Sequence, residues 1–166
     1  ASVVEDVVDP ERPIIDPHHH LWKTPSMWGT YELADLWADT SSGHNVEKTV
    51  FVDCHSEYRT EGPSHLKPVG ETEYVAEVAT ESRRDANRAT IAGIVGHANM
   101  TLGSAVEEVL VAHEQAGKGL FRGIRHAGPS DDTGTLTNAG GRWPCPYDRE
   151  DFREGVKTLG RMGYSY

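Results

Sequence analysis

The sequence predicts an α/β fold, a partial (β/α)8 TIM barrel with about four strand–helix units and the start of a fifth strand. Four runs of β-branched and aromatic residues each end at a histidine, and amphipathic helical patterns lie between them. Nearly continuous apolar strands that alternate with helices favour parallel pairing, with the helices packed outside the sheet. The ends of the four runs recur about every 36 residues, a spacing typical of one unit of such a barrel.

Each predicted strand is a short apolar run that closes on a histidine. The first, in residues 13–22, reads Pro-Ile-Ile-Asp-Pro-His-His-His-Leu-Trp, so a strand ends in a cluster of three histidines. The others cover residues 48–55, 90–97 and 120–126, and a fifth is expected to open at residues 163–166. Residues 23–47 are less regular, with a short helix expected over residues 31–39.

The helices predicted between the strands cover residues 71–84, 104–116 and 151–161. The second of them carries an apolar stripe that includes Val109 and His113, so His113 is predicted to be a core histidine. The charged residues at 71–73 are interpreted as the solvated end of the first helix. Residues 127–146 are rich in Gly, Pro, Ser, Asp and Thr, which predicts a long exposed loop.

The chain length is short for this fold. Eight units of about 36 residues need about 290, whereas the chain has 166. We therefore expect residues 1–12 to be an N-terminal extension and residues 13–166 to be the N-terminal portion of a truncated barrel domain. A half-barrel leaves two sheet edges and one side of its core exposed, so association into a homo-oligomer is open to it.

Composition and charge exclude several classes of partner. The net charge of −10, from 16 Lys+Arg and 26 Asp+Glu, disfavours nucleic acid and anionic membranes. No apolar run approaches the ~20 residues that span a bilayer, and the N-terminus lacks the pattern of a signal peptide. Two cysteines, Cys54 and Cys145, do not make a disulfide framework, which favours a reducing, cytoplasmic location. We expect a small molecule as the binding partner.

The strongest candidate metal ligands are His18 and His20. They are two residues apart, so on an extended strand both imidazoles point to the same face and can bind one metal ion, with Zn²⁺ the usual candidate. Asp16 is in phase with them and could support them from outside. His19 points the other way and is expected to pack or to lie behind the ligands.

The candidates for substrate binding lie at the ends of the later strands: Arg125, His55, His97 and His126. Arg125 is interpreted as a clamp for a substrate carboxylate, and the alternative is an ion pair with Asp53 or Glu57. Cys54 next to His55 could suggest a thiolate nucleophile, but neighbours in a strand face opposite sides, which argues against a catalytic pair. Four aromatic residues could line a substrate pocket or simply pack: Trp22, Trp28, Tyr31 and Trp37.

The segment from Ile15 to Trp22 resembles the opening strand of the amidohydrolase-related proteins (amidohydrolase family 2), TIM-barrel metal-dependent hydrolases of the amidohydrolase superfamily. The sequences Phe-Val-Asp-Cys-His-Ser at residues 51–56, with Gly-Glu-Thr-Glu at 70–73, are similar to the second unit of one branch. Residues 93–98 and 121–126 fit the third and fourth units. The resemblance covers nearly all of the chain from Pro13 onward.

The resemblance implies a mechanism that the spacing alone does not. His18 and His20 match the first-strand metal ligands of the family, and Arg125 matches a strand-four position suited to substrate binding. In the family the metal polarises a scissile carbonyl or activates water, and an aspartate from the eighth strand usually acts as the general base. That aspartate and the later histidines are expected beyond residue 166, so this chain is expected to be inactive alone. Some lactonases of the family need no metal.

The leading hypothesis is therefore a fragment of a metal-dependent hydrolase that cleaves a lactone, ester or amide bond of a small carboxylate-bearing substrate. A nonoxidative decarboxylase of the same family is one alternative. The other is a non-catalytic half-barrel that dimerises or acts as an interaction module.

Overall fold

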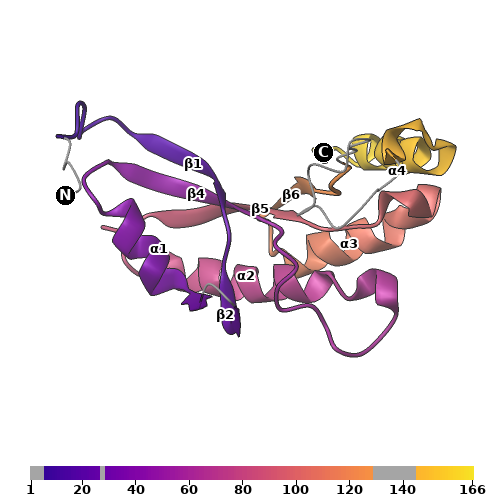
Figure 1. Ribbon diagram of the computed structural model, residues 1–166, viewed down its shortest axis with the longest axis horizontal. Helices are drawn as coiled ribbons and strands as arrows, with labels where there is room; N and C mark the ends of the chain where they lie inside the picture. Colours follow the sequence, from indigo (N-terminus) through magenta and orange to yellow (C-terminus); the bar gives the residue numbers. More distant parts are fainter. Residues whose placement is uncertain (1–5, 27–28, 129–144) are drawn as a thin grey trace, which may run out of the picture.

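The computed structural model describes residues 6–26, 29–128 and 145–166, and it has a mixed α/β architecture. Four parallel strands form one sheet in the order β1 (Ile14–His19), β4 (Val46–Val52), β5 (Thr90–Gly96) and β6 (Phe121–Ile124). Each strand lies next to its predecessor in the sheet, and helical segments connect them (Figure 1). The predicted α/β class with parallel strands is confirmed.

Helices α1 (Leu33–Thr40), α2 (Val69–Ser82) and α3 (Val106–Ala116) lie along the same face of the sheet (Figure 1). They bury two apolar clusters. The first joins α1 and α2 to β4 and β5 through Leu21, Leu33, Leu36, Phe51, Val75, Ala76, Ala79, Ile91 and Ile94. The second joins α3 to β6 and to α4 (Glu150–Arg161) through Ala98, Met100, Val106, Val109, Leu110, Phe121, Ile124, Phe152 and Leu159. Burial of these side chains is the main force that holds the helices on the sheet.

The predicted helices occur with shifted ends. Helix α2 begins at Val69, two residues earlier than expected, and α4 begins at Glu150. The predicted helix over 104–116 is two elements, a 3₁₀ segment η2 (Met100–Ala105) and α3, with a kink at Gly103, whose φ is 61°. Only glycine adopts this backbone conformation without strain, which explains why the helix does not run through.

The segment after β1 contains an element that the sequence pattern did not predict. Strands β2 (Trp22–Ser26) and β3 (Gly29–Tyr31) pair antiparallel, apart from the main sheet. The Trp22 indole N–H donates to the carbonyl of Gly29 over 2.7 Å, and Gly29 has a φ of 79°. Helix α1 follows, with a capping box in which Glu32 and Asp35 each accept a backbone N–H of the other.

The end of the chain lies beside β6. Ser165 forms one isolated parallel bridge with Gly123, at the position where the fifth strand is predicted to open. The rest of a barrel is not part of the described structure, so the partial TIM barrel stays a prediction. Two further segments, Ser64–Leu66 (η1) and Pro146–Asp148 (η4), are short 3₁₀ turns.

Residues 6–13 form no helix or strand, and β1 begins directly after them. The division of the chain at residue 13 stays a prediction. Most of the predicted loop over 127–146, and Trp28, lie outside the described residues. Among the helices that the structure describes, none is both long and apolar enough to cross a membrane.

Candidate functional site

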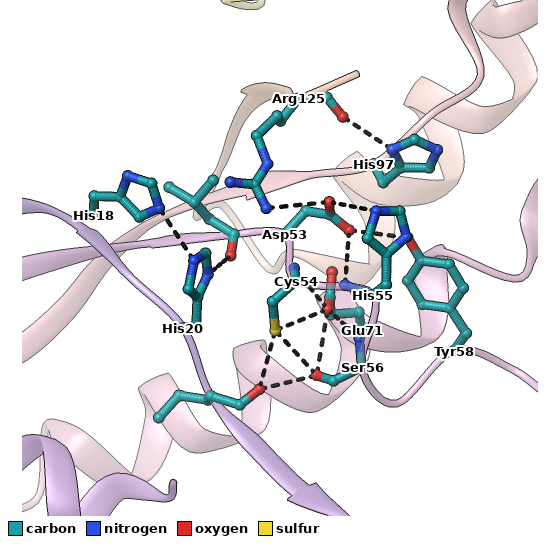
Figure 2. Close-up of polar contacts among 12 residues, drawn as sticks. His18, His20, Asp53, Cys54, His55, Ser56, Tyr58, Glu71, His97 and Arg125 are labelled. Atoms are coloured by element: carbon teal, nitrogen blue, oxygen red, sulfur yellow. Dashed lines mark hydrogen bonds and ion pairs between the residues drawn. The ribbon is translucent and has the colours of Figure 1, made fainter. Parts of the chain in front are cut away.

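The carboxyl ends of the four parallel strands bring most of the predicted site residues to one edge of the sheet. His18, His20, Asp53, His55, His97, Arg125 and His126 all lie at or just after these ends. Figure 2 shows two groups at this edge: the pair His18–His20, and a cluster around the carboxylate of Asp53. The two groups are also close in space, because the ring of His20 contacts the carbonyl of Val52, the residue before Asp53.

The rings of His18 and His20 face each other, with their Nε2 atoms 3.2 Å apart. The Nδ1 atom of His20 lies 2.7 Å from the carbonyl oxygen of Val52. A carbonyl only accepts, so Nδ1 carries the proton and Nε2 of His20 presents a lone pair. Burial lowers the pKa of His20, which keeps the ring neutral. The same-face arrangement predicted for the two histidines is present.

Asp16 and His19 support this pair without joining it. Oδ1 of Asp16 accepts the backbone N–H of His18 over 3.0 Å, which fixes the backbone and not the ring. His19 is buried with its ring against Phe51, at a centroid distance of 5.8 Å. Burial lowers the pKa of His19 to about 4, and its ring nitrogens have no hydrogen-bond partner in the described structure. His19 is a neutral packing residue.

The second group consists of Asp53, His55 and His97, each of which offers one ligand atom within 4.8 Å of the other two. Among the residues that the structure describes, these are the three that could together hold a metal ion. Asp53 continues the β-ladder, since its N–H donates to the carbonyl of Val95 over 2.8 Å. His97 follows β5, and Figure 2 shows its ring above that of His55.

The chain leaves strand geometry directly after Asp53. His55 has a φ of 63° and Glu57 a φ of 52°, the left-handed region that non-glycine residues rarely adopt. The turn directs the His55 ring back over Asp53, with Nε2 of His55 3.7 Å from Oδ2 of Asp53. Strained backbone of this kind is held in place by surrounding contacts and is common at functional sites.

Tyr58 bridges Asp53 and His55 through its hydroxyl group. Its hydroxyl lies 2.9 Å from Oδ1 of Asp53 and 3.0 Å from Nδ1 of His55. Burial, followed by the charge of Asp53, raises the pKa of Tyr58, so the phenol stays protonated. It donates its single proton to the carboxylate and accepts from the imidazole.

A second carboxyl group, Glu71 on α2, lies buried beneath Asp53 (Figure 2). Its Oε1 accepts the N–H groups of Ser56 at 2.7 Å and Cys54 at 3.2 Å. Its Oε2 is buried and has no donor group in reach. Glu71 also forms a hydrogen bond with the carboxyl group of Asp53. Two carboxylates cannot donate to each other, so one of the two carboxyl groups must carry a proton.

The proton belongs to Glu71. Burial, and then the negative charge of Asp53, raise the pKa of Glu71 to about 8. Burial also acts to raise the pKa of Asp53, but the hydrogen bond from Glu71 and the rings of His55 and His97 lower it. The net pKa of Asp53 lies below its ordinary value, so Asp53 is the charged member of the pair. The interpretation of residues 71–73 as a solvated helix end is wrong for Glu71, because the first turn of α2 packs beneath the loop after β4.

Arg125 makes the ion pair that the sequence analysis held as the alternative to a substrate clamp. Its Nη2 lies 3.6 Å from Oδ2 of Asp53, and its side chain is 36% exposed. The distance is longer than a hydrogen bond, so the guanidinium is not locked in place. His126 uses Nδ1 to accept the N–H of Met100 over 3.0 Å, which orients its ring beside His97. Substrate binding by these residues stays a prediction.

The surroundings of Cys54 disfavour a nucleophilic thiolate. Burial raises the pKa of its thiol to about 11, and its Sγ lies 3.5 Å from the carbonyl of Leu21 and from Oε1 of Glu71. His113 is fully buried, as predicted, between the hydroxyl of Thr72 at 2.8 Å and the carbonyl of His97 at 2.9 Å.

Two hollows adjoin the histidine groups. One, of about 460 Å³, is lined by Trp22, Thr24, Pro25, Cys54, His55, Ser56 and Glu57. Another, of about 420 Å³, is lined by aromatic and polar residues that include His18, His20, Trp22 and Tyr31. A larger one of about 700 Å³ lies between η2 and α4, and it contains none of the site residues. Trp37 does not line either of the two hollows beside the histidines. It packs against the first apolar cluster, and its indole N–H donates to the carbonyl of Ala89.

Sequence reasoning did not assign Tyr58 or Glu71 to the site, and it considered Asp53 only as an ion-pair partner of Arg125. Tyr58 and Glu71 meet Asp53 only through the turn after β4 and the packing of α2, which leave no mark in the sequence. Asp53 had a signal, because it stands two residues before His55 in the same arrangement as His18 before His20.

Comparisons of the chain with protein-family models, with curated proteins and with solved structures find no match.

Proposed function

We propose that this protein is a metal-dependent hydrolase of the amidohydrolase type, which cleaves a lactone, ester or amide bond of a small carboxylate-bearing substrate. The observation that carries the proposal is the separation of 3.2 Å between the Nε2 atoms of His18 and His20 at the carboxyl end of β1. In the proposal, the four strand–helix units form the first half of a TIM barrel, whose active site lies at this end of the strands.

The histidine pair fits a divalent metal. Two ligand nitrogens 3.2 Å apart, each about 2.0–2.1 Å from a Zn²⁺ ion, subtend an angle of about 100° at the ion. This is close to the tetrahedral angle that zinc prefers. The hydrogen bond from His20 to the carbonyl of Val52 fixes the tautomer and the ring, as is usual for metal-binding histidines. When bound, the ion would polarise the scissile carbonyl and acidify a water molecule.

Arg125 is the group that binds the substrate carboxylate in this proposal. Its side chain is partly exposed and only loosely paired with Asp53, so the guanidinium can turn toward an anion at the open edge of the site. The hollow beside His55 supplies a wall of mixed polarity for the rest of a small substrate, with the Trp22 ring on one side. Cys54 and His126 take no part in the chemistry, since each is engaged with protein groups.

The test measures hydrolysis by the protein after its metal has been removed with a chelator and Zn²⁺ has been added back. The substrates are lactones and esters that carry a carboxylate, and the rate of hydrolysis is measured as the rate of acid release at constant pH. We expect activity that rises in proportion to bound zinc and falls at least 100-fold in His18→Asn and His20→Asn. His44→Asn is the matched control, because His44 is exposed and lies outside the site. Activity that persists in the chelator would refute the proposal, and release of carbon dioxide in place of acid would identify a decarboxylase.

A further inference from the structure

We propose that Asp53, His55 and His97 form a second divalent-metal site, separate from the His18–His20 pair, that takes a transition-metal ion such as Zn²⁺. This assigns His55 and His97 to the ion and not to direct contact with substrate. The proposal stands on the hydrogen bonds around the three side chains, and it does not depend on the reaction proposed above.

The first step concerns His97. Its Nδ1 lies 3.0 Å from the carbonyl oxygen of Arg125. The carbonyl can only accept, so Nδ1 carries the proton and Nε2 is left with a lone pair. Metal-binding histidines are commonly oriented in this way, by donation of the other ring N–H to a backbone carbonyl.

The second step gives the same result for His55. The hydroxyl of Tyr58 has one proton, which it donates to Oδ1 of Asp53 over 2.9 Å. The hydroxyl oxygen must then accept from Nδ1 of His55, 3.0 Å away, so Nε2 of His55 also carries a lone pair. That nitrogen faces Oδ2 of Asp53 at 3.7 Å.

The third step concerns the carboxylate itself. Asp53 is 1% exposed, and its Oδ1 is occupied by Tyr58 and by the N–H of His55. Its Oδ2 lies 3.6 Å from Nη2 of Arg125 and 3.7 Å from Nε2 of His55, and the carboxyl group of Glu71 is the other partner of the carboxylate. A buried carboxylate oxygen that faces the Nε2 lone pair of His55 is unfavourable unless a proton or a metal ion lies between them.

The geometry allows a metal ion with a small adjustment. The three ligand atoms lie within 4.8 Å of one another, whereas ligands about 2.0–2.2 Å from one ion are about 3.0–3.6 Å apart. The side chain of His55 is 63% exposed, so its ring can close this gap without disturbing the core. Two imidazoles and a carboxylate form a ligand set of zinc sites, whereas Mg²⁺ and Ca²⁺ prefer oxygen ligands.

Arg125 is the competitor for this site. Its guanidinium occupies the open side of the Asp53 carboxylate, and its positive charge opposes a divalent ion. Arg125→Met removes the charge and keeps the apolar part of the side chain. This variant is therefore expected to bind the second ion more tightly than the unmodified protein.

The experiment is Zn²⁺ binding to the chelator-stripped protein at pH 7.5, by titration calorimetry and by metal analysis after dialysis. We expect two equivalents in the unmodified protein, and one in His55→Asn and in Asp53→Asn, which keep the backbone and the size of the side chain. The double variant His18→Asn/His20→Asn should also bind one equivalent, and a protein with all of these substitutions should bind none. Mg²⁺ should not compete, and Arg125→Met should bind the second equivalent about tenfold more tightly.

The possible negative results distinguish between the two proposed metal sites. If His55→Asn and Asp53→Asn keep the full zinc content, the second site is refuted while the His18–His20 pair stands. If the double variant keeps two equivalents, the His18–His20 assignment fails and the second site is unaffected. An Arg125→Met protein that binds the second ion no tighter would refute its placement beside Asp53. Circular dichroism of His55→Asn, whose ring lies at the surface, shows whether lost binding reflects lost structure.

Discussion

The ring of His113 fills the space next to Gly96. A Cβ atom at residue 96 would lie 2.9 Å from Cε1 and 3.1 Å from Nδ1 of this ring, closer than van der Waals contact allows. The Nε2–H of the same ring donates to the carbonyl of His97 over 2.9 Å. The residue before the site is therefore small because the core histidine that supports the site backbone needs the room.

We expect Gly96→Ala to lower the free energy of unfolding by about 1–3 kcal/mol, the usual cost of overpacking a well-packed core. The added methyl group would displace His113 from Thr72, whose hydroxyl lies 3.2 Å from the same position. Urea denaturation measures the change. Gly160→Ala is the control, because nothing lies within 4 Å of a Cβ there and the residue is inside α4. It should raise stability by about 0.5–1 kcal/mol.

The stability of the protein should fall with acid because of His113. Burial lowers its pKa to about 4, below the ordinary histidine value of 6.5, so the unfolded chain binds the proton more readily. Stability from this group is complete above pH 6.5 and is lost as the pH falls toward 4, by up to about 3 kcal/mol. Denaturation midpoints between pH 4.5 and 7 should show a smaller dependence in His113→Gln than in the unmodified protein. His44→Gln, at an exposed site, should keep the full dependence.

Glu71 should give the opposite dependence. Its pKa is raised to about 8 by burial and by Asp53, so the folded protein retains a proton that the unfolded chain loses above the ordinary value of 4.5. Stability from this group is complete below pH 4.5 and declines as the pH rises toward 8. Glutamine can donate to Asp53 permanently and still accept from Ser56, so Glu71→Gln removes the decline.

In chelator, we expect Glu71→Gln to match the unmodified protein near pH 4.5 and to be more stable at pH 7.5, by about 1–3 kcal/mol. Denaturation at the two pH values measures the difference. Glu77→Gln is the control, since Glu77 is exposed on the same helix. Equal stability of Glu71→Gln and the unmodified protein at pH 7.5 would mean that Glu71 is ionised there.

The four parallel strands and the placement of His18, His20, His97 and Arg125 at one edge followed from the sequence. Apolar runs of β-branched residues are a strong local signal, and parallel strands align their carboxyl ends without further information. The hairpin of β2 and β3 gave no such signal. Its first strand, Trp22–Ser26, contains Lys23 and Pro25, and its pairing depends on Gly29 and the indole of Trp22.

The polar contacts of the cluster could not be predicted for a different reason. Glu71 has the sequence context of an exposed helix start, and only the packing of α2 under the turn after β4 buries it. His55 meets Asp53 through a left-handed backbone that local propensity disfavours. Both features are set by contacts between segments that lie apart in the chain, and pattern analysis does not include such contacts.

The thiol of Cys54 should react slowly with alkylating reagents. Burial raises its pKa from 9.0 to about 11, and the nearby Glu71 adds to the shift, so the thiolate fraction at pH 8 is about 100-fold lower than for an ordinary cysteine. Iodoacetamide labelling of Cys145→Ser, in which Cys54 is the remaining thiol, is expected to be about 100-fold slower than that of a model peptide. Cys54→Ser provides the comparison for Cys145. Labelling of Cys54 at the peptide rate would contradict the buried, carboxyl-bound position of the thiol and would reopen a nucleophilic role beside His55.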